Sequence, residues 1–461
     1  MRKTFIKIFL GALAIRWGYS VSMFLAMGNG GLMGVDSTSY VEAGNTIASS
    51  MRAGSLHGWL WLGPDPYMMP LHAWFVGIGA LIAGRYAVLF DVLIQGLLDA
   101  GTCLLIYDMA RTIKPRYALA AAVAAAINPT QIVIAGMVYP DTMFVFFVAL
   151  FLLGSLRWLR LPCWPSTCVI ILGLIGAAWS RILVVPFAIV LPFGLALTMA
   201  IMGRFQRRHL VPLACALAIF LFSVAPISLR NKVEYGSWAF TPQAGIHLAR
   251  WVVPLIWEAQ EGTPWAKGYA EIERRAAALP HPADENVFQQ SQRYNEIALD
   301  ALYRIGALEI ARAWTIGAVL NLGTPAIILS PPVAQLPRTG FYATPGENAL
   351  TKIANFLFRS DNSFYAWILL AGVGGLFFVR ILQLLGLAAV VIQAHWIPAC
   401  LLVSWCLFIL AVNGPVASPK YRLPMEPALM VMAGAGWSLL RRKSRLATPR
   451  IGHTSGTRDQ S

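Results

Sequence analysis

Apolar runs of membrane-spanning length recur along almost the whole chain, and they constrain the fold more than any motif does. The first run reaches Met27, and similar runs follow up to about residue 440. A bilayer is crossed only by helices or closed barrels, and these runs have the length of spanning helices. Since 57% of the 461 residues are hydrophobic and only 12% are charged, we predict an all-α integral membrane protein, a polytopic bundle of about ten to twelve spans.

Basic residues set the predicted orientation, because they collect in loops that stay in the cytoplasm. Clusters follow the apolar runs at 111–116, 157–160, 204–209 and 441–443, and Arg2, Lys3 and Lys7 precede the first run. This pattern places both termini in the cytoplasm and predicts a multi-pass protein of the plasma (inner) membrane. It also accounts for the net charge of +15 without a nucleic-acid partner.

The predicted organisation is one transmembrane domain, residues 1–443, followed by a disordered cytoplasmic tail, 444–461. Two polar stretches are expected on the outer face, a first loop at 28–70 and a larger loop at 230–303. The larger loop should begin as ordered loop and end in a helix at the membrane surface. Residues 71–83 are expected to form a short apolar helix and residues 86–109 a span, whereas hydropathy leaves the number of spans between 305 and 395 open.

One charge inside the first span needs a partner. Arg16 lies in apolar sequence, where an unpaired charge is costly. Asp91 or Asp99 of the next span could neutralise it, which we favour over a functional role. In the alternative class, a secondary transporter or lipid flippase, these three residues would be the working groups.

Acidic and basic residues meet on the predicted outer face. Asp36 follows a glycine-rich turn, just before a capping-box pattern from Ser39 to Glu42 that predicts a helix start, and Asp141 follows another turn. A carboxylate can take a proton from an attacking hydroxyl or amine, while cations stabilise a departing phosphate. The basic residues predicted on this face are Arg52, His57, His72, Arg181, Arg230, Lys420 and Arg422.

Short motifs in a fixed order resemble a known superfamily. They are Asp36-Ser37 with Tyr40, the run Tyr67 to Leu71, Asn128-Pro129, Tyr139-Pro140-Asp141, Ser180-Arg181, Arg230-Asn231 with Tyr235-Gly236, Gly245 to Leu248, and Lys420 to Pro424. Together they cover some 400 residues. The order is similar to that of the GT-C membrane glycosyltransferases, especially the bacterial branch related to the lipid A aminoarabinose transferase and the protein O-mannosyltransferases.

The resemblance implies inverting transfer of a sugar from an isoprenoid (polyprenyl) phosphate to a cell-envelope acceptor on the outer face. It implies Asp36 as the catalytic base and Asp141, at a position that is often acidic in the family, as a second catalytic residue. We expect the donor phosphate to be bound by Arg181, Arg230, Lys420 and Arg422. We expect substrate contacts from Tyr40, His57, His72, Asn231 and Tyr421.

Departures from the family pattern bear on the chemistry. Family members often carry two acids close together in the first loop, whereas Asp36 is followed by Ser37, so a divalent metal is less favoured than a metal-free mechanism, and no cofactor is predicted. A polysaccharide polymerase or ligase with a lipid-diphosphate donor is the other enzymatic alternative. It would depend less on an acid at position 36.

Overall fold

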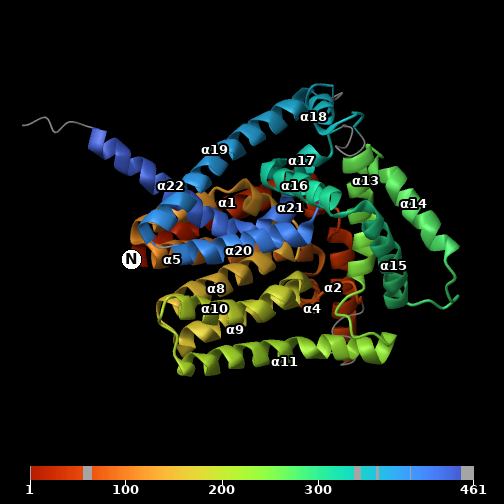
Figure 1. The fold of residues 1–461 in the computed structure, drawn as a ribbon, viewed down its shortest axis with the longest axis horizontal. Helices are drawn as coiled ribbons and strands as arrows, with labels where there is room; N and C mark the ends of the chain where they lie inside the picture. Colours follow the sequence, from red (N-terminus) through yellow and green to blue (C-terminus); the bar gives the residue numbers. More distant parts are fainter. Residues whose placement is uncertain (1, 56–64, 337–343, 360–362, 395, 448–461) are drawn as a thin grey trace, which may run out of the picture.

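The computed structural model describes residues 2–55, 65–336, 344–359, 363–394 and 396–447, and within them it contains helices and turns but no strand. Long helices lie side by side across the molecule, with the N-terminus at one end of the bundle and α2, α13, α14 and α15 at the other (Figure 1). The long helices are α1 (Arg2–Met27), α5 (Ala87–Ile113), α8 (Asp141–Arg160), α9 (Trp164–Ser180), α10 (Val185–Ile201), α11 (Leu210–Tyr235), α19 (Ser363–Ala394), α20 (Trp396–Asn413) and α22 (Glu426–Ala447). The all-α class is therefore confirmed.

Seven helical segments in the described ranges are long and apolar enough to span a membrane, or nine if each of two bent pairs counts as one span. One bent pair joins residues 115–126 to Pro129–Ala135 at 48°, and the other joins Val287–Ile305 to Ala307–Gly323 at 107°. The apolar helix α9 is shorter, with 17 residues. The count is lower than the ten to twelve predicted because broken and short helices take the place of full spans.

Shorter helices connect or cover the bundle. They are α2 (Ser37–Arg52), α4 (Pro70–Ala83), α6 (Ala118–Ala126), α7 (Pro129–Ala135), α12 (Gln243–His247), α13 (Val253–Glu261), α14 (Trp265–Ala278), α15 (Val287–Ile305), α16 (Ala307–Gly323), α17 (Pro331–Ala334), α18 (Ala349–Phe358) and α21 (Pro419–Arg422). Helices α4 and α5 agree with the predicted boundaries at 71–83 and 86–109. The first part of the loop at 230–303, expected as ordered loop, instead contains α12 and α13. Helix α22 continues past the predicted tail start at 444, and the rest of the tail lies outside the described residues.

Arg16 is neutralised inside the bundle by Asp99 rather than Asp91. Its Nε lies 2.7 Å from Asp99 Oδ2, and both side chains are almost fully buried. Another guanidinium nitrogen donates to the carbonyl of Ala125 at 2.9 Å. That carbonyl would bond the amide of residue 129 in a continuous helix, but Pro129 has no N–H. Arg16 therefore stabilises the break between α6 and α7.

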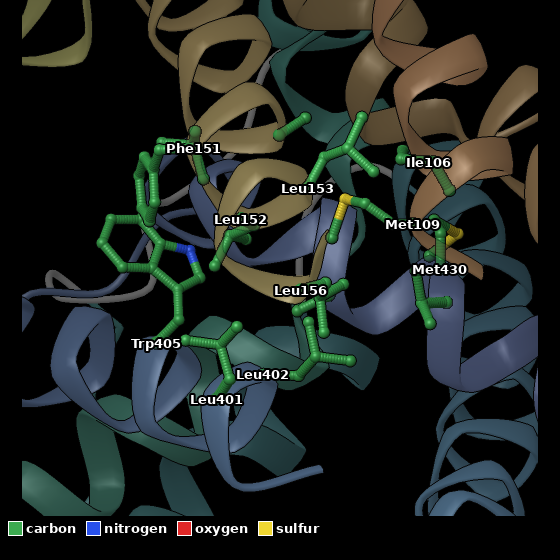
Figure 2. Packing of buried hydrophobic residues seen from close by; sticks show 14 of the residues in the cluster. Ile106, Met109, Phe151, Leu152, Leu153, Leu156, Leu401, Leu402, Trp405 and Met430 are labelled. Carbon is green, nitrogen blue, oxygen red and sulfur yellow. The ribbon is translucent and has the colours of Figure 1, made fainter. Parts of the chain in front are cut away.

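The apolar core fixes the turn that precedes α22. Figure 2 shows Phe151 and Leu152 of α8 facing Trp405 of α20. The rings of Phe151 and Trp405 meet edge to face with centroids 5.1 Å apart, a favourable aromatic geometry. The indole N–H of Trp405 donates to the carbonyl of Pro424 at 2.8 Å. The core is thereby linked to the segment that carries Lys420 and Arg422.

Candidate active site

The loop that carries Asp36 is tied to the chain just before Asp141. The amide of Val138 donates to the carbonyl of Leu32 (3.1 Å), and the hydroxyl of Ser37 donates to the carbonyl of Val138 (2.9 Å). These two bonds bring the start of α2 beside the start of α8. Two acidic residues that are about a hundred positions apart in sequence thus lie in one region.

Asp36 stands at the start of α2 without capping it. The helix begins at Ser37, two residues before the predicted start, and the Asp36 side chain makes no capping bond. Its Oδ2 instead lies 2.6 Å from Nζ of Lys420, and the Asp36 side chain remains 49% exposed. The carboxylate is therefore accessible and already beside a cation.

Lys420 is held between aromatic rings on the short helix α21. Its Nζ lies 4.8 Å from the ring centroid of Tyr139 and 5.7 Å from that of Tyr421, distances suited to cation–π attraction. Burial alone would lower the pKa of Lys420, but the carboxylates of Asp141 and Asp36, together with Tyr421, raise it above its ordinary value. Lys420 is therefore a fixed positive charge.

Asp141 forms the second ion pair of the site. It is the first residue of α8 and is 3% exposed, and its Oδ2 lies 2.6 Å from a terminal nitrogen of Arg181, which follows α9. Burial would lower the pKa of Arg181, but the Asp141 carboxylate raises it. Asp141 is thus paired and enclosed, in contrast to Asp36.

Tyr40 and His72 complete the group. Tyr40 interacts electrostatically with Arg181, Asp141 and Lys420, and burial raises the pKa of its hydroxyl. The ring of Tyr40 meets His72 edge to face with centroids 5.0 Å apart. A cavity of about 70 Å³ adjoins these side chains, and its lining includes Tyr40, Tyr67, His72, Arg181 and Gln243.

We call these residues the Asp36–Lys420 cluster. Its members are Asp36, Tyr40, His72, Tyr139, Asp141, Arg181, Lys420 and Tyr421. Among the described residues, no three His, Cys, Asp or Glu side chains gather closely enough to hold a metal ion.

Other predicted site residues lie apart from the cluster. Arg422 is fully buried and donates to Glu426, Thr130 and the carbonyls of Asn321 and Thr324 at 2.7 to 2.9 Å. These bonds compensate for the burial of the Arg422 guanidinium inside the bundle. His57 lies outside the described residues.

Arg230 and Asn231 stand at the end of α11. Nε of Arg230 donates to Oδ1 of Asn231 at 2.9 Å, and the Asn231 amide nitrogen donates to the carbonyls of Ala239 and Phe240. Asn231 therefore fixes the following loop. Ile227, one turn before Arg230, packs against Met69, which lines the small cavity. Arg230 itself interacts electrostatically with Glu234, Tyr235 and Asp65.

The sequence prediction missed two positioning residues. Tyr139 was noted only as a motif member, yet its ring supports Lys420. Gln95 holds His72, with its Oε1 3.4 Å from His72 Nε2, while its amide nitrogen donates to the carbonyl of Met137 at 2.6 Å. A polar residue inside a predicted span was the signal for Gln95.

Replacing Gly34 with Ala is expected to lower activity by about 10- to 100-fold, because misplacement near the reacting groups is costly. A Cβ at position 34 would lie 2.0 Å from the hydroxyl oxygen of Tyr139, so the ring beneath Lys420 must move. The initial rate of the reaction at the cluster measures this. Gly30→Ala is the matched control, since its Cβ would meet no atom within 4 Å. Equal rates in both variants would show that the ring position is unimportant.

No family model and no curated protein matches the sequence. The fold, however, is similar to solved structures of the Archaeoglobus fulgidus oligosaccharyltransferase. The apo structure matches with a TM-score of 0.52 and 16% identity over 95% of the chain and 51% of its own length. The structure of AglB with an inhibitory peptide and a dolichol-phosphate matches with a TM-score of 0.53 and 14% identity over 98% and 52%.

The chain thus spans about half the length of these oligosaccharyltransferases. ArnT from Cupriavidus metallidurans bound to undecaprenyl phosphate gives a TM-score of only 0.37 at 14% identity, over 95% of the chain and 78% of its own length. The similarity to the archaeal enzymes extends over nearly every described helix. This chain therefore shares the fold of the transmembrane part of the matched archaeal structures over nearly its whole length.

Proposed function

We propose that the protein transfers a sugar from a polyprenyl phosphate to a cell-envelope acceptor, a lipid, glycan or protein, at the Asp36–Lys420 cluster. One observation carries the proposal: the accessible carboxylate of Asp36 lies 2.6 Å from Nζ of Lys420, a largely buried lysine 384 positions later in the sequence. The GT-C fold supports it, and so does the dolichol-phosphate held by the archaeal AglB. The pattern of basic residues supports an active site on the outer face of the plasma membrane.

In the proposed reaction, an acceptor hydroxyl or amine attacks the anomeric carbon from the face opposite the phosphate. Its proton passes to Asp36, the bond between the anomeric carbon and the phosphate oxygen breaks, and polyprenyl phosphate leaves with the electron pair. Lys420 and Arg181 stabilise the charge that develops on the phosphate. The configuration at the anomeric carbon is inverted.

The two acids have different proposed roles because their surroundings differ. The Asp36 side chain is 49% exposed, whereas that of Asp141 is 4% exposed and bound to Arg181. Only Asp36 is open to an incoming acceptor, so it is the proposed base. Asp141 holds Arg181 in place as a positioning residue.

The pairing of Asp36 with Lys420 suggests an order of binding. An anionic phosphate competes with the Asp36 carboxylate for the lysine, and phosphate accepts strong charge-assisted hydrogen bonds. Donor binding would therefore release Asp36 for proton transfer. Tyr40 and His72, which line the adjacent cavity, are the proposed contacts to the transferred sugar, and Tyr421 supports Lys420.

Replacing Lys420 with Met is expected to raise the KM for the polyprenyl-phosphate donor by about 10- to 100-fold, the effect of losing one charge-assisted hydrogen bond. Lys420→Arg should retain part of the affinity. Steady-state rates at varied donor concentration measure the change. Lys267→Met, which removes an exposed lysine of α14, is the matched control. A normal donor KM in Lys420→Met would contradict phosphate binding by Lys420.

A further inference from the structure

An apolar groove opens on the surface of the bundle, and none of its lining residues belongs to the Asp36–Lys420 cluster. It has a volume of about 760 Å³ and lies between α6 and α19, with α22 beneath it. Leu119, Val123 and Ile127 form one wall and are each about half exposed. Leu382 of α19 lies on the opposite side, and small residues such as Ala433 form the floor.

The groove exists because α22 packs very closely against both neighbours. A Cβ on Gly434 would lie 2.5 Å from the backbone nitrogen of Ala121 in α6, and one on Gly436 would lie 2.0 Å from the carbonyl of Leu382 in α19. Glycine allows this close approach because it has no side chain. The groove therefore lies where α22 packs against both α6 and α19.

Charge is concentrated at one end of the groove. Arg116, Trp437, Ser438 and Arg441 line it there, and both arginines are exposed. Arg116 stands on the turn Pro115–Tyr117, which contacts both α5 and α22. The rings of Phe5 in α1 and Tyr107 in α5 lie 5.0 Å apart, so this end of the groove is on the same side of the bundle as the start of α1. Two arginines and a tryptophan at one end of an apolar groove suit a lipid with an anionic headgroup at the membrane interface.

We propose that this groove binds one anionic phospholipid, such as phosphatidylglycerol. Arg116 and Arg441 hold its phosphate, a group that arginine can bind in bidentate fashion. One acyl chain lies along Leu119, Val123 and Ile127. A zwitterionic lipid binds more weakly, since its ammonium group opposes the arginines.

Fluorescence quenching of Trp437 tests the proposal on the full chain in vesicles. Brominated phosphatidylglycerol or brominated phosphatidylcholine is added in increasing mole fraction to a phosphatidylcholine background. The difference between wild type and Trp437→Phe isolates this residue from the others among the sixteen tryptophans. We expect half-maximal Trp437 quenching at a roughly 25-fold lower mole fraction of the anionic lipid. Arg116→Gln/Arg441→Gln should abolish that preference, since each arginine contributes about fivefold.

Arg207→Gln/Arg208→Gln is the matched control, because it removes the same charge from the turn before α11. An equal loss of preference in this control would overturn the proposal, as would equal quenching by both lipids in wild type. Displacement of the brominated phosphatidylglycerol by stoichiometric polyprenyl phosphate would identify the donor lipid as the occupant instead. Absence of Trp437 quenching by either lipid would indicate that protein, such as a second copy, covers the groove.

Discussion

Asp36→Asn is expected to lower the rate of sugar transfer by about 100- to 10,000-fold, the usual contribution of a positioned general base. Asparagine can still accept a hydrogen bond from Lys420, so the local arrangement is retained, but its amide cannot take the proton of the acceptor. The initial rate of transfer at saturating donor measures the loss. Because only the proton acceptor changes, the melting temperature should stay near that of wild type.

Glu42→Gln is the matched control for Asp36→Asn. Glu42 is an exposed acid on the same helix, α2, and its replacement should leave the rate unchanged. If Asp36→Asn transfers sugar as fast as Glu42→Gln, Asp36 is not the base. Asp141→Asn would then need testing in the same assay.

Arg422→Ala is expected to destabilise the fold by about 3 to 5 kcal/mol, because removing one partner of a buried pair leaves an uncompensated charge. Nε of Arg422 lies 2.9 Å from Oε1 of Glu426, and both side chains are almost completely buried. The variant also leaves the carbonyls of Asn321 and Thr324, near the end of α16, without their donor. Thermal unfolding and the yield of monodisperse protein in detergent measure the effect.

The double variant Arg422→Met/Glu426→Met removes both charges of the pair. Its stability, compared with that of Arg422→Ala, distinguishes the loss of the ion pair from the cost of leaving one buried charge unpaired. Since the double variant leaves no buried carboxylate, it should be clearly more stable than Arg422→Ala. A contrary result would be Arg422→Ala that unfolds at the wild-type temperature but shows a raised donor KM. That outcome would return Arg422 to the phosphate-binding group.

The fold class and many helix boundaries could be predicted because hydropathy and proline positions act locally. The need of Arg16 for a carboxylate follows from residue chemistry. The choice of Asp99 over Asp91 could not be predicted, because it depends on how α1 and α5 pack. Hydropathy could not predict the sharp bend between α15 and α16 either, because it does not distinguish a helix that crosses the membrane from one that bends along the bundle.

The candidate site could likewise be predicted only in part from the sequence. Sequence pattern placed Asp36, Asp141 and Lys420 on one face, but their contacts depend on the bonds that tie Ser37 and Leu32 to Val138. Lys420 and Arg422 were predicted to act together, yet residues two apart on a helix do not face each other. In α21, Lys420 points to the cluster, whereas Arg422 points into the bundle and pairs with Glu426.

The most direct test of the central claim uses membranes whose pool of polyprenyl-phosphate sugars is radiolabelled. Wild type and Asp36→Asn are compared at matched expression, and both the labelled product and the released polyprenyl phosphate are quantified. We predict transfer by wild type and its loss in Asp36→Asn. Equal product from both proteins, transfer only from a diphosphate-linked pool, or movement of intact labelled lipid across the bilayer without product would contradict the account.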